Sequence, residues 1–281
     1  MNVKNENKWI ILYLLAVTLF TAYILLDTFV IPRKYQTVKV TDKKETASYK
    51  AADITISEYE LDKTVVHVAE IISNGPGTLQ TAFAYDTFGQ NIKAPTSEIA
   101  ESHGAILAIN GDFYGARSAG YVIRGGVVYR AAKSNRYDLV IYEDGHFGIV
   151  SELGTTPENL IAAGAVDVFS FGPPLINQGK IMISRLYEAG MDNIYNPRTA
   201  IGITSDNHYI FVVTDGRNGN SKGLSIYQLA KFMEELGCEC AYNLDGGGSA
   251  TMYYNGEVIN EPSTFGEFVT EREVSDIVYI R

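Results

Sequence analysis

Four polar segments of this 281-residue chain combine carboxylate, guanidinium, amide and hydroxyl groups, and each borders a predicted strand. Loops at strand ends commonly carry function, because a rigid sheet positions them. The segments are Asn110-Gly111-Asp112-Phe113-Tyr114 after strand 105–109, Asn196-Pro197-Arg198-Thr199-Ala200 before strand 201–203, Asp215-Gly216-Arg217 after strand 209–213, and Asn243-Leu244-Asp245-Gly246-Gly247-Gly248-Ser249 at the end of strand 241–244.

The side chains in the first three segments allow both chemical and structural readings. Arg198 provides a planar, permanently charged fork that suits phosphate or carboxylate, although a surface salt bridge would use the same group. Asn110 and Asp112 place an amide beside a carboxylate, and Asp215 and Arg217 flank a glycine. Polar turns would have the same composition.

The fourth segment is the most unusual, because Gly246, Gly247 and Gly248 are consecutive. Three glycines cost backbone entropy, so they indicate special dihedral angles or a close approach of another group to the backbone. Their N–H groups could hold an anionic oxygen, with Asp245 and Ser249 facing the same place. A merely flexible loop is the alternative.

In combination and in this order, the four segments resemble the phosphodiester glycosidase family. The resemblance covers about residues 52–281 and extends to Asn260-Glu261-Pro262-Ser263 and Arg272-Glu273-Val274-Ser275-Asp276. It implies hydrolysis of a glycosyl phosphodiester or phosphorylated glycan at the anomeric C–O bond, releasing sugar and a phosphomonoester. It also suggests substrates among cell-surface or exopolysaccharide glycans.

A phosphomonoester is a good leaving group, so stabilising its developing charge matters more than donating a proton to it. We therefore hypothesise a phosphate site and a separate carboxylate site. Asp245 would activate water or attack the sugar, and Asp112 would position a hydroxyl or transfer a proton, although these roles could be exchanged. The phosphate site would contain Arg198, Thr199, the amides of Gly246, Gly247 and Gly248, and Ser249, with Asn110, Asn243, Asp215 and Arg217 as second choices for contacts or support.

Three other functions remain open. The same pocket could bind glycan or phosphate without turnover, or the motifs could maintain the fold of a surface scaffold. A metal-dependent phosphodiesterase would use Asp112, Asp215 and Asp245 as oxygen ligands for Ca²⁺ or Mg²⁺. The glycosidase mechanism itself requires no cofactor. The four histidines are dispersed along the chain and predict no transition-metal site.

Composition narrows the function classes further. A net charge of −10 without a basic stripe argues against a nucleic-acid partner. Two cysteines, Cys238 and Cys240, provide no disulfide framework and read as packing residues. Oligomeric state is not indicated.

The N-terminal residues predict a membrane anchor. The stretch 9–26 contains no charged residue before Asp27 and spans roughly 27 Å as a helix, close to a hydrocarbon core. No small-residue cleavage site follows it. We predict a cytoplasmic tail (1–8), a transmembrane anchor (9–30), a stalk (31–51) and an extracytoplasmic domain (52–281), although Arg33, Lys34 and Lys39 weaken the orientation argument.

The elements that must position these segments alternate between short strands and helices, which predicts one α/β or α+β domain with a mixed β-sheet core flanked by helices. Ser225 and Gln228 form a capping-box pattern before an apolar helical face. The predicted strands are 54–56, 64–72, 80–85, 105–109, 201–203, 209–213 and 241–244, and the predicted helices are 95–103, one starting at 156–157, and 225–237.

Overall fold

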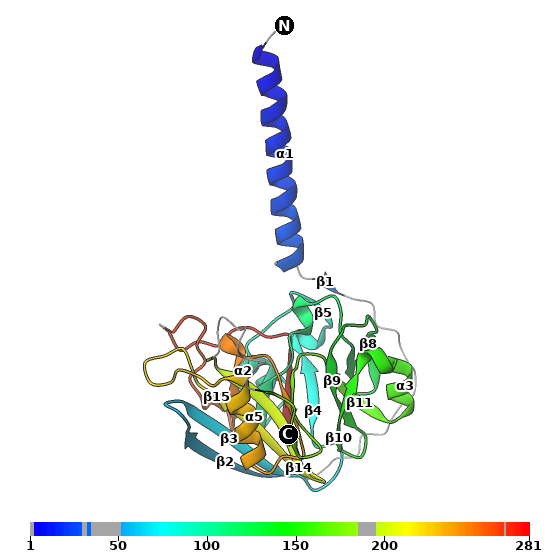
Figure 1. Cartoon of the computed structure of the whole chain (residues 1–281), viewed down its shortest axis with the longest axis vertical. Helices are drawn as coiled ribbons and strands as arrows, with labels where there is room; N and C mark the ends of the chain where they lie inside the picture. Colours follow the sequence, from blue (N-terminus) through cyan, green and yellow to red (C-terminus); the bar gives the residue numbers. More distant parts are fainter. Residues whose placement is uncertain (1–2, 30–32, 35–51, 185–194, 267) are drawn as a thin grey trace.

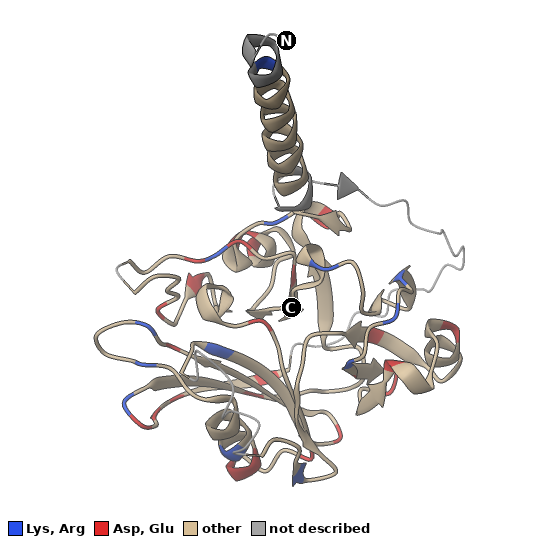
Figure 2. Cartoon of the chain, turned by 45° about the horizontal axis from the view of Figure 1, so that its top comes forward, with Lys and Arg blue, Asp and Glu red and all other residues tan. Residues whose placement is uncertain are grey.

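The computed structural model describes residues 3–29, 33–34, 52–184, 195–266 and 268–281. Helix α1 (Val3–Phe29) includes the stretch Lys8–Leu26, which has a mean hydropathy of 2.3 and buries none of its residues. No residue between Lys8 and Asp27 is charged, and Figure 2 shows the described part of this helix in tan below one blue band near its top. By length and composition it could cross a membrane or serve as a signal sequence.

Most of the predicted stalk, 31–51, lies outside the described residues, as do residues 1 and 2 of the predicted tail. Two stalk residues form strand β1 (Arg33–Lys34), which pairs with β5 (Gly89–Gln90). The boundary between stalk and domain stays a prediction.

The largest sheet has seven strands and runs in the order β13-β12-β16-β14-β15-β3-β2. Its central pair, β14 and β15, is joined by a two-residue turn at Asp206 and Asn207. The strands are β2 (Asp53–Glu60), β3 (Val65–Ile72), β12 (Pro174–Asn177), β13 (Lys180–Ile181), β14 (Arg198–Ser205), β15 (His208–Thr214) and β16 (Cys240–Asn243).

A second sheet has five strands in the order β18-β17-β6-β19-β4. Its middle strand, β6, contains the buried run that ends at Asn110. The strands are β4 (Gln80–Phe83), β6 (Leu107–Asn110), β17 (Met252–Tyr254), β18 (Glu257–Val258) and β19 (Asp276–Ile280).

A third sheet, with the order β10-β9-β11-β7-β8, was not predicted from the sequence. Its first hairpin turns at Gly125 and Gly126, which both have positive φ, as a tight hairpin turn requires. The strands are β7 (Val122–Arg124), β8 (Val127–Arg130), β9 (Tyr137–Tyr142), β10 (Phe147–Ser151) and β11 (Ala165–Phe169).

The inner faces of the three sheets meet in one central core, because successive side chains on a strand point to opposite faces. Ile201 and Phe211 of the largest sheet enter this core, together with Ile109 and Phe169 from the other two sheets. The alternate residues of β14 and β15 pack beneath a helix instead.

One short helix covers the outer face of each sheet, and Figure 1 shows α5 and α3 on opposite sides of the domain. Helix α5 begins after Ser225, whose side chain and that of Gln228 form the predicted capping box. Helix α3 has the predicted Pro157 in its first turn. The helices are α2 (Thr96–Ser102), α3 (Pro157–Ala162) and α5 (Ile226–Glu235), with short 3-10 turns at 84–86, 114–116, 152–154 and 247–249.

The predicted α+β domain with an apolar N-terminal helix is confirmed. Each strand pairing in the described residues is antiparallel, so the arrangement is α+β rather than a parallel α/β fold. Cys238 and Cys240 are buried and free, as expected for packing residues.

Candidate functional site

Three of the four polar segments meet where β6, β14 and β16 reach the same edge of the core. Strands β14 and β16 pair antiparallel with Ala200 opposite Asn243, so the start of one lies beside the end of the other. Asn110 ties them together. Its Oδ1 accepts a hydrogen bond from Thr199 Oγ1 (2.7 Å), and its Nδ2 donates one to the carbonyl oxygen of Asp245 (2.7 Å).

These hydrogen bonds show how the side chains of Asn110 and Thr199 are used within the protein. Both residues are fully buried, and the Thr199 hydroxyl proton is used by Asn110. The Thr199 hydroxyl therefore has no proton left to donate to a phosphate in this structure, and the placement of Thr199 in a phosphate site stays a prediction. The sequence did not reveal this, because the two residues are 89 positions apart.

Asp112 lies just beyond Asn110 and is almost completely buried. Its Oδ1 accepts the backbone N–H of Tyr114 (2.8 Å), and its Oδ2 accepts that of Ser170 (3.1 Å). These bonds lock the loop after β6 to the end of β11. The carboxylate is therefore well placed to hold these two loops in position.

Beneath Asp112 lies a buried ion cluster, which we define as Arg124, Asp112 and Asp276. Arg124 Nη2 is 2.6 Å from Asp276 Oδ2 and 3.6 Å from Asp112 Oδ2. Burial, and next the neighbouring Asp112, raise the pKa of Asp276 to about 7. Arg124 also lies over the Phe169 ring, with 3.9 Å between its Cζ and the ring centroid.

Asp245 has a more open environment, with 12% of its side chain exposed against 1% for Asp112. Its Oδ2 accepts a hydrogen bond from Arg272 Nη2 (3.2 Å), and its Oδ1 accepts the N–H of Gly246 (3.0 Å). Burial raises its pKa, against the opposing charge of Arg272 and hydrogen bonds from Ser249 and Gly246. A carboxyl group so placed can take part in proton transfer.

Arg272 also organises the glycine segment, since its Nε donates to Ser249 Oγ (2.9 Å) and its Nη2 to the carbonyl of Gly246 (2.8 Å). The prediction that another group approaches the glycines closely is confirmed. That group is the chain itself: an added Cβ would lie 2.6 Å from Pro197 O at Gly246 and 2.0 Å from Thr264 Oγ1 at Gly248.

The predicted anion nest is only partly available. The N–H of Gly246 donates to Asp245, and that of Gly247 donates to Pro197 O (2.9 Å). Two of the three predicted amide donors to phosphate are therefore engaged within the protein, and the phosphate site that the glycines would form stays a prediction. The sequence pattern alone did not show that Pro197 O accepts the N–H of Gly247.

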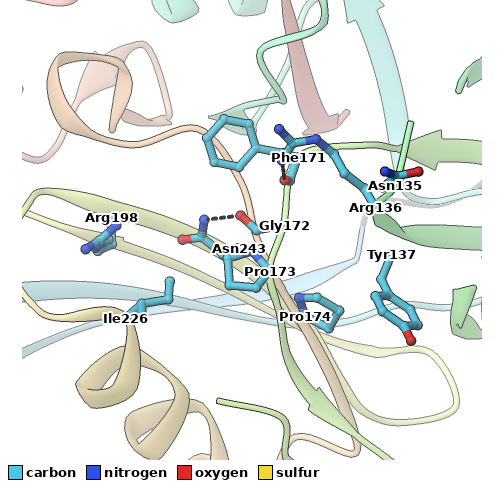
Figure 3. A pocket seen from close by; sticks show the side chains of 10 residues that line it. All are labelled: Asn135, Arg136, Tyr137, Phe171, Gly172, Pro173, Pro174, Arg198, Ile226 and Asn243. Carbon is cyan, nitrogen blue, oxygen red and sulfur yellow. Dashed lines mark hydrogen bonds between the residues drawn. The ribbon is translucent and has the colours of Figure 1, made fainter. Parts of the chain in front are cut away.

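Arg198 and Asn243 line a pocket of about 470 Å³ (Figure 3). Arg198 Nε donates to the carbonyl of Leu224 (3.0 Å), and Asn243 Nδ2 donates to the carbonyl of Gly172 (2.8 Å). The remaining lining residues, which the sequence reasoning missed, are Asn135, Arg136, Tyr137, Phe171, Gly172, Pro173, Pro174 and Ile226.

Arg117 is a further cation that sequence reasoning missed. Its Nη1 donates to the carbonyl of Ser170 (2.9 Å), and its Cζ lies 4.7 Å from the centroid of the Phe171 ring. Burial and then Arg136 lower its pKa, while Asp112 and Asp245 raise it. Arg117 therefore lies in the electrostatic field of both predicted carboxylates.

Asp215 and Arg217, from the remaining segment, are engaged with neighbouring loops. Asp215 Oδ1 accepts the N–H of Glu261 (2.8 Å) and is buried, while Arg217 binds Asn196 Oδ1 through Nη2 (2.7 Å) and Thr264 O through Nη1 (2.9 Å). Both residues fit the supporting role that was one of their predicted alternatives.

The carboxylates proposed as metal ligands do not converge. Within the described parts of the chain, no group of three or more His, Cys, Asp or Glu side chains is arranged to hold a metal ion. Asp112, Asp215 and Asp245 therefore do not form the oxygen-ligand set that the metal-dependent alternative requires.

Comparison with known proteins identifies relatives across most of the chain. It is 29% identical over 237 residues to the SPbeta prophage-derived uncharacterized protein YomE of Bacillus subtilis, covering 78% of this chain and 36% of YomE. It is 29% identical over 186 residues to the N-acetylglucosamine-1-phosphodiester alpha-N-acetylglucosaminidase of Bos taurus, covering 61% of this chain and 35% of that protein. This chain thus spans about a third of each relative's length.

A solved structure shares the fold. The zebrafish N-acetylglucosamine-1-phosphodiester alpha-N-acetylglucosaminidase catalytic domain, auto-inhibited by its pro-peptide, matches with a TM-score of 0.64 at 20% identity, covering 89% of this chain and 87% of that one. The sequence model of the phosphodiester glycosidase family matches residues 103–281, which include each of the four polar segments. The chain therefore belongs to the phosphodiester glycosidase family of hydrolases.

Proposed function

We propose that the domain hydrolyses a glycosyl phosphodiester at the anomeric C–O bond. Water oxygen bonds to the anomeric carbon, the bond from that carbon to the bridging oxygen breaks, and the phosphomonoester leaves with the bridging oxygen and its electron pair. One water proton passes to a protein carboxylate. The products are free sugar and a phosphomonoester.

The observation that carries this proposal is the placement of Asp245. It is a largely buried carboxylate, less buried than Asp112, with a raised pKa at the junction of three polar segments, within the family's matched region. We assign it water activation or nucleophilic attack. Its contact with Arg272 would keep the carboxylate oriented during either step.

Asp112 and Arg198 have different proposed parts. Asp112, held by two backbone N–H groups, would position the loops around the sugar rather than exchange a proton. Arg198 would contact the phosphate from the pocket that it lines. A permanently charged guanidinium stabilises the charge that develops as the phosphomonoester leaves.

We also propose that α1 anchors the protein in a membrane with its domain on the extracytoplasmic side. The apolar stretch of α1 exposes its whole surface, which a bilayer would cover. Cell-surface or exopolysaccharide glycans would then be within reach as substrates. Protease accessibility of the domain in intact cells tests this orientation, and protection from protease would contradict it.

The reaction is tested with detergent-solubilised full-length protein, a panel of sugar-1-phosphodiesters, and water enriched in ¹⁸O. Cleavage of the anomeric C–O bond should give a phosphomonoester without ¹⁸O. Label in the phosphomonoester would show P–O cleavage, and sugar 1-phosphate plus an alcohol would show cleavage at the other ester bond. Either result contradicts the proposal.

Two controls accompany this measurement. Asp245→Asn should abolish most product, whereas Asp206→Asn, at an exposed position on the β14–β15 turn, should not. Added EDTA should leave the rate unchanged. Loss of activity with EDTA would favour the metal-dependent phosphodiesterase, and binding without any turnover would favour a glycan-binding role.

A further inference from the structure

Arg117 is a cation of the site that is not paired with a carboxylate. Two other arginines beside Asp112 and Asp245 are so paired, since Arg124 contacts Asp276 and Arg272 contacts Asp245. Within the described parts of the chain, Arg117 forms one hydrogen bond, from Nη1 to the carbonyl of Ser170 (2.9 Å), and no ion pair. Its charge is therefore available to an anion.

The guanidinium of Arg117 is held in place by its neighbours. Its Cζ lies 4.7 Å from the centroid of the Phe171 ring and 5.9 Å from that of the Phe113 ring, within the range of cation–π contacts. A guanidinium has five N–H donors in a fixed fork, and the bond to Ser170 uses one of them. Because Arg117 is only half-buried, it also has surface at which a ligand can make contact. A planar fork oriented in this way suits a phosphate.

Two hydrogen-bonded links connect Arg117 with the carboxylates of the site. Ser170, whose carbonyl accepts the bond from Arg117, donates its N–H to Asp112 Oδ2 (3.1 Å). Gly111, next to Asp112, accepts the N–H of Asp245 at its carbonyl oxygen (3.2 Å). Arg117, Asp112 and Asp245 are thus arranged around the same loop after β6.

The electrostatic surroundings of Arg117 agree with this placement. Burial, and next the like charge of Arg136, lower the pKa of Arg117, whereas Asp112 and Asp245 act in the opposite direction. The charged form is disfavoured on balance, so a bound anion would stabilise it. Asp245 acts on Arg117 without forming an ion pair with it. The two groups are therefore near each other but not in direct contact.

We propose that Arg117 binds the phosphate of the glycosyl phosphodiester, next to the anomeric carbon at which Asp245 acts. This rests on the proposed function and adds Arg117 as a residue that determines specificity for the phosphate. In such a substrate only the bridging oxygen separates phosphorus from the anomeric carbon. The phosphate therefore comes close to Asp112 and Asp245, whose ionised forms repel it unless a cation compensates. This contact does not depend on the one proposed for Arg198.

Binding of inorganic phosphate to the detergent-solubilised full-length protein, measured by titration calorimetry, tests the contact without requiring turnover. We expect millimolar or tighter binding by the wild type. Arg117→Gln should weaken it about tenfold, the effect expected for one charge-assisted hydrogen bond. Arg117→Lys keeps the charge but loses the planar fork, so its affinity should lie between those of the wild type and Arg117→Gln.

Arg281→Gln is the matched control, because Arg281 is exposed and follows β19 at the end opposite Asp276. It removes the same charge and should leave phosphate affinity within about twofold, as expected for a screened surface charge. A rising NaCl concentration should weaken phosphate binding more in the wild type than in Arg117→Gln, which a purely structural role of Arg117 would not produce. Absence of phosphate binding by the wild type, or equal affinity in Arg117→Gln, would overturn the proposal. A thermal melt checks that each variant is folded.

The outcome is separable from that of the proposed reaction. If no phosphodiester is hydrolysed but Arg117→Gln loses phosphate affinity, the assignment of Arg117 stands and the reaction assignment fails. If phosphodiesters are hydrolysed and Arg117→Gln changes neither KM nor phosphate affinity, the reaction stands and the assignment of Arg117 fails.

Discussion

Asp112 and Asp245 each lie beside an arginine, and the two surroundings differ mainly in burial. The guanidinium next to Asp112 is only 5% exposed, while that of Arg272, next to Asp245, is 39% exposed. Asp112 is held by backbone N–H groups above a buried ion cluster. Asp245 is less deeply buried, with 12% of its side chain exposed. Residue type alone therefore does not separate a carboxylate that holds the fold from one that can react.

The largest effect on stability should come from a change in the buried ion cluster beside Asp112. Arg124→Met leaves Asp112 and Asp276 without their shared cation, and removing one partner from buried ions costs about 3–5 kcal/mol. We expect the free energy of unfolding of the full-length protein, measured in urea at neutral pH, to fall by about that amount.

The control is Arg272→Met, which removes the more exposed of the two arginines, the one beside Asp245. Because Arg272 is 39% exposed and solvent screens its charge, its loss of stability should be smaller than that of Arg124→Met. Equal losses in the two variants would show that burial does not distinguish the two arginines.

The next effect should appear in turnover rather than stability. Asp245→Asn keeps the size of the side chain but cannot accept a proton or attack the sugar. We expect phosphomonoester release to slow by about 100-fold to 1,000-fold, which corresponds to about 3–4 kcal/mol of activation free energy. Initial rates and the unfolding midpoint should be measured on the same preparation.

A large drop in the midpoint of Asp245→Asn, with a matching fall in the amount of folded protein, would instead make Asp245 a structural residue of its loop. Replacement of a carboxyl whose pKa is already raised by a neutral amide of the same size should not produce such a drop.

The complementary change, Asp112→Asn, should mainly destabilise. One carboxylate oxygen becomes an NH₂ group facing either the N–H of Tyr114 or that of Ser170, which leaves a buried donor unpaired. The expected cost is about 1–3 kcal/mol in unfolding free energy, measured in urea. A fully stable variant with slow turnover would assign Asp112 to the chemistry and not to the scaffold.

Much of the local structure was predictable because its signals lie close together in the sequence. Ser225 and Gln228 are three residues apart and formed the expected capping box. The missed third sheet also carried a short-range signal, since Gly125-Gly126 between two β-branched runs is typical of a tight hairpin. The flanking strands β7 and β8 are short, so any alternation of apolar and polar residues extends over few positions in each strand.

The site was predictable in its segments but not in its contacts. Asn110 and Asp245 are 135 residues apart and meet only after β6, β14 and β16 come together. The burial of Thr199, Gly246 and Gly247 and the hydrogen-bond partners of these three residues also depend on that long-range strand pairing. The same holds for Arg136, which lies outside each polar segment and reaches the pocket through the carbonyl of Phe171.

The last prediction concerns the pH dependence of stability and Asp138, a carboxyl still deeper than Asp112. Asp138 is fully buried behind Ser170, and burial, followed by the nearby Glu152, raises its pKa to about 9. Burial would also raise the pKa of Glu152, but hydrogen bonds from Ser134, Ser170 and Tyr121 lower it instead. The folded protein therefore keeps Asp138 protonated beside an ionised Glu152.

The sign of the pH dependence follows from this difference. In the unfolded chain Asp138 ionises near the ordinary aspartate pKa of 3.8, so between that pH and about 9 the folded state binds the extra proton. Stability that is fully present below pH 3.8 is lost as the pH rises through this range. The loss is at most about 1.4 kcal/mol per pH unit.

Asp138→Asn, which has no proton to lose, should remove this slope in urea unfolding at pH values from 6 to 8, whereas the exposed control Asp206→Asn should keep it. Parallel stability curves for wild type and Asp138→Asn would mean that the buried carboxyl is solvated or paired well enough to ionise, and that burial separates the two sides of the site less sharply than the comparison of Asp112 with Asp245 implies.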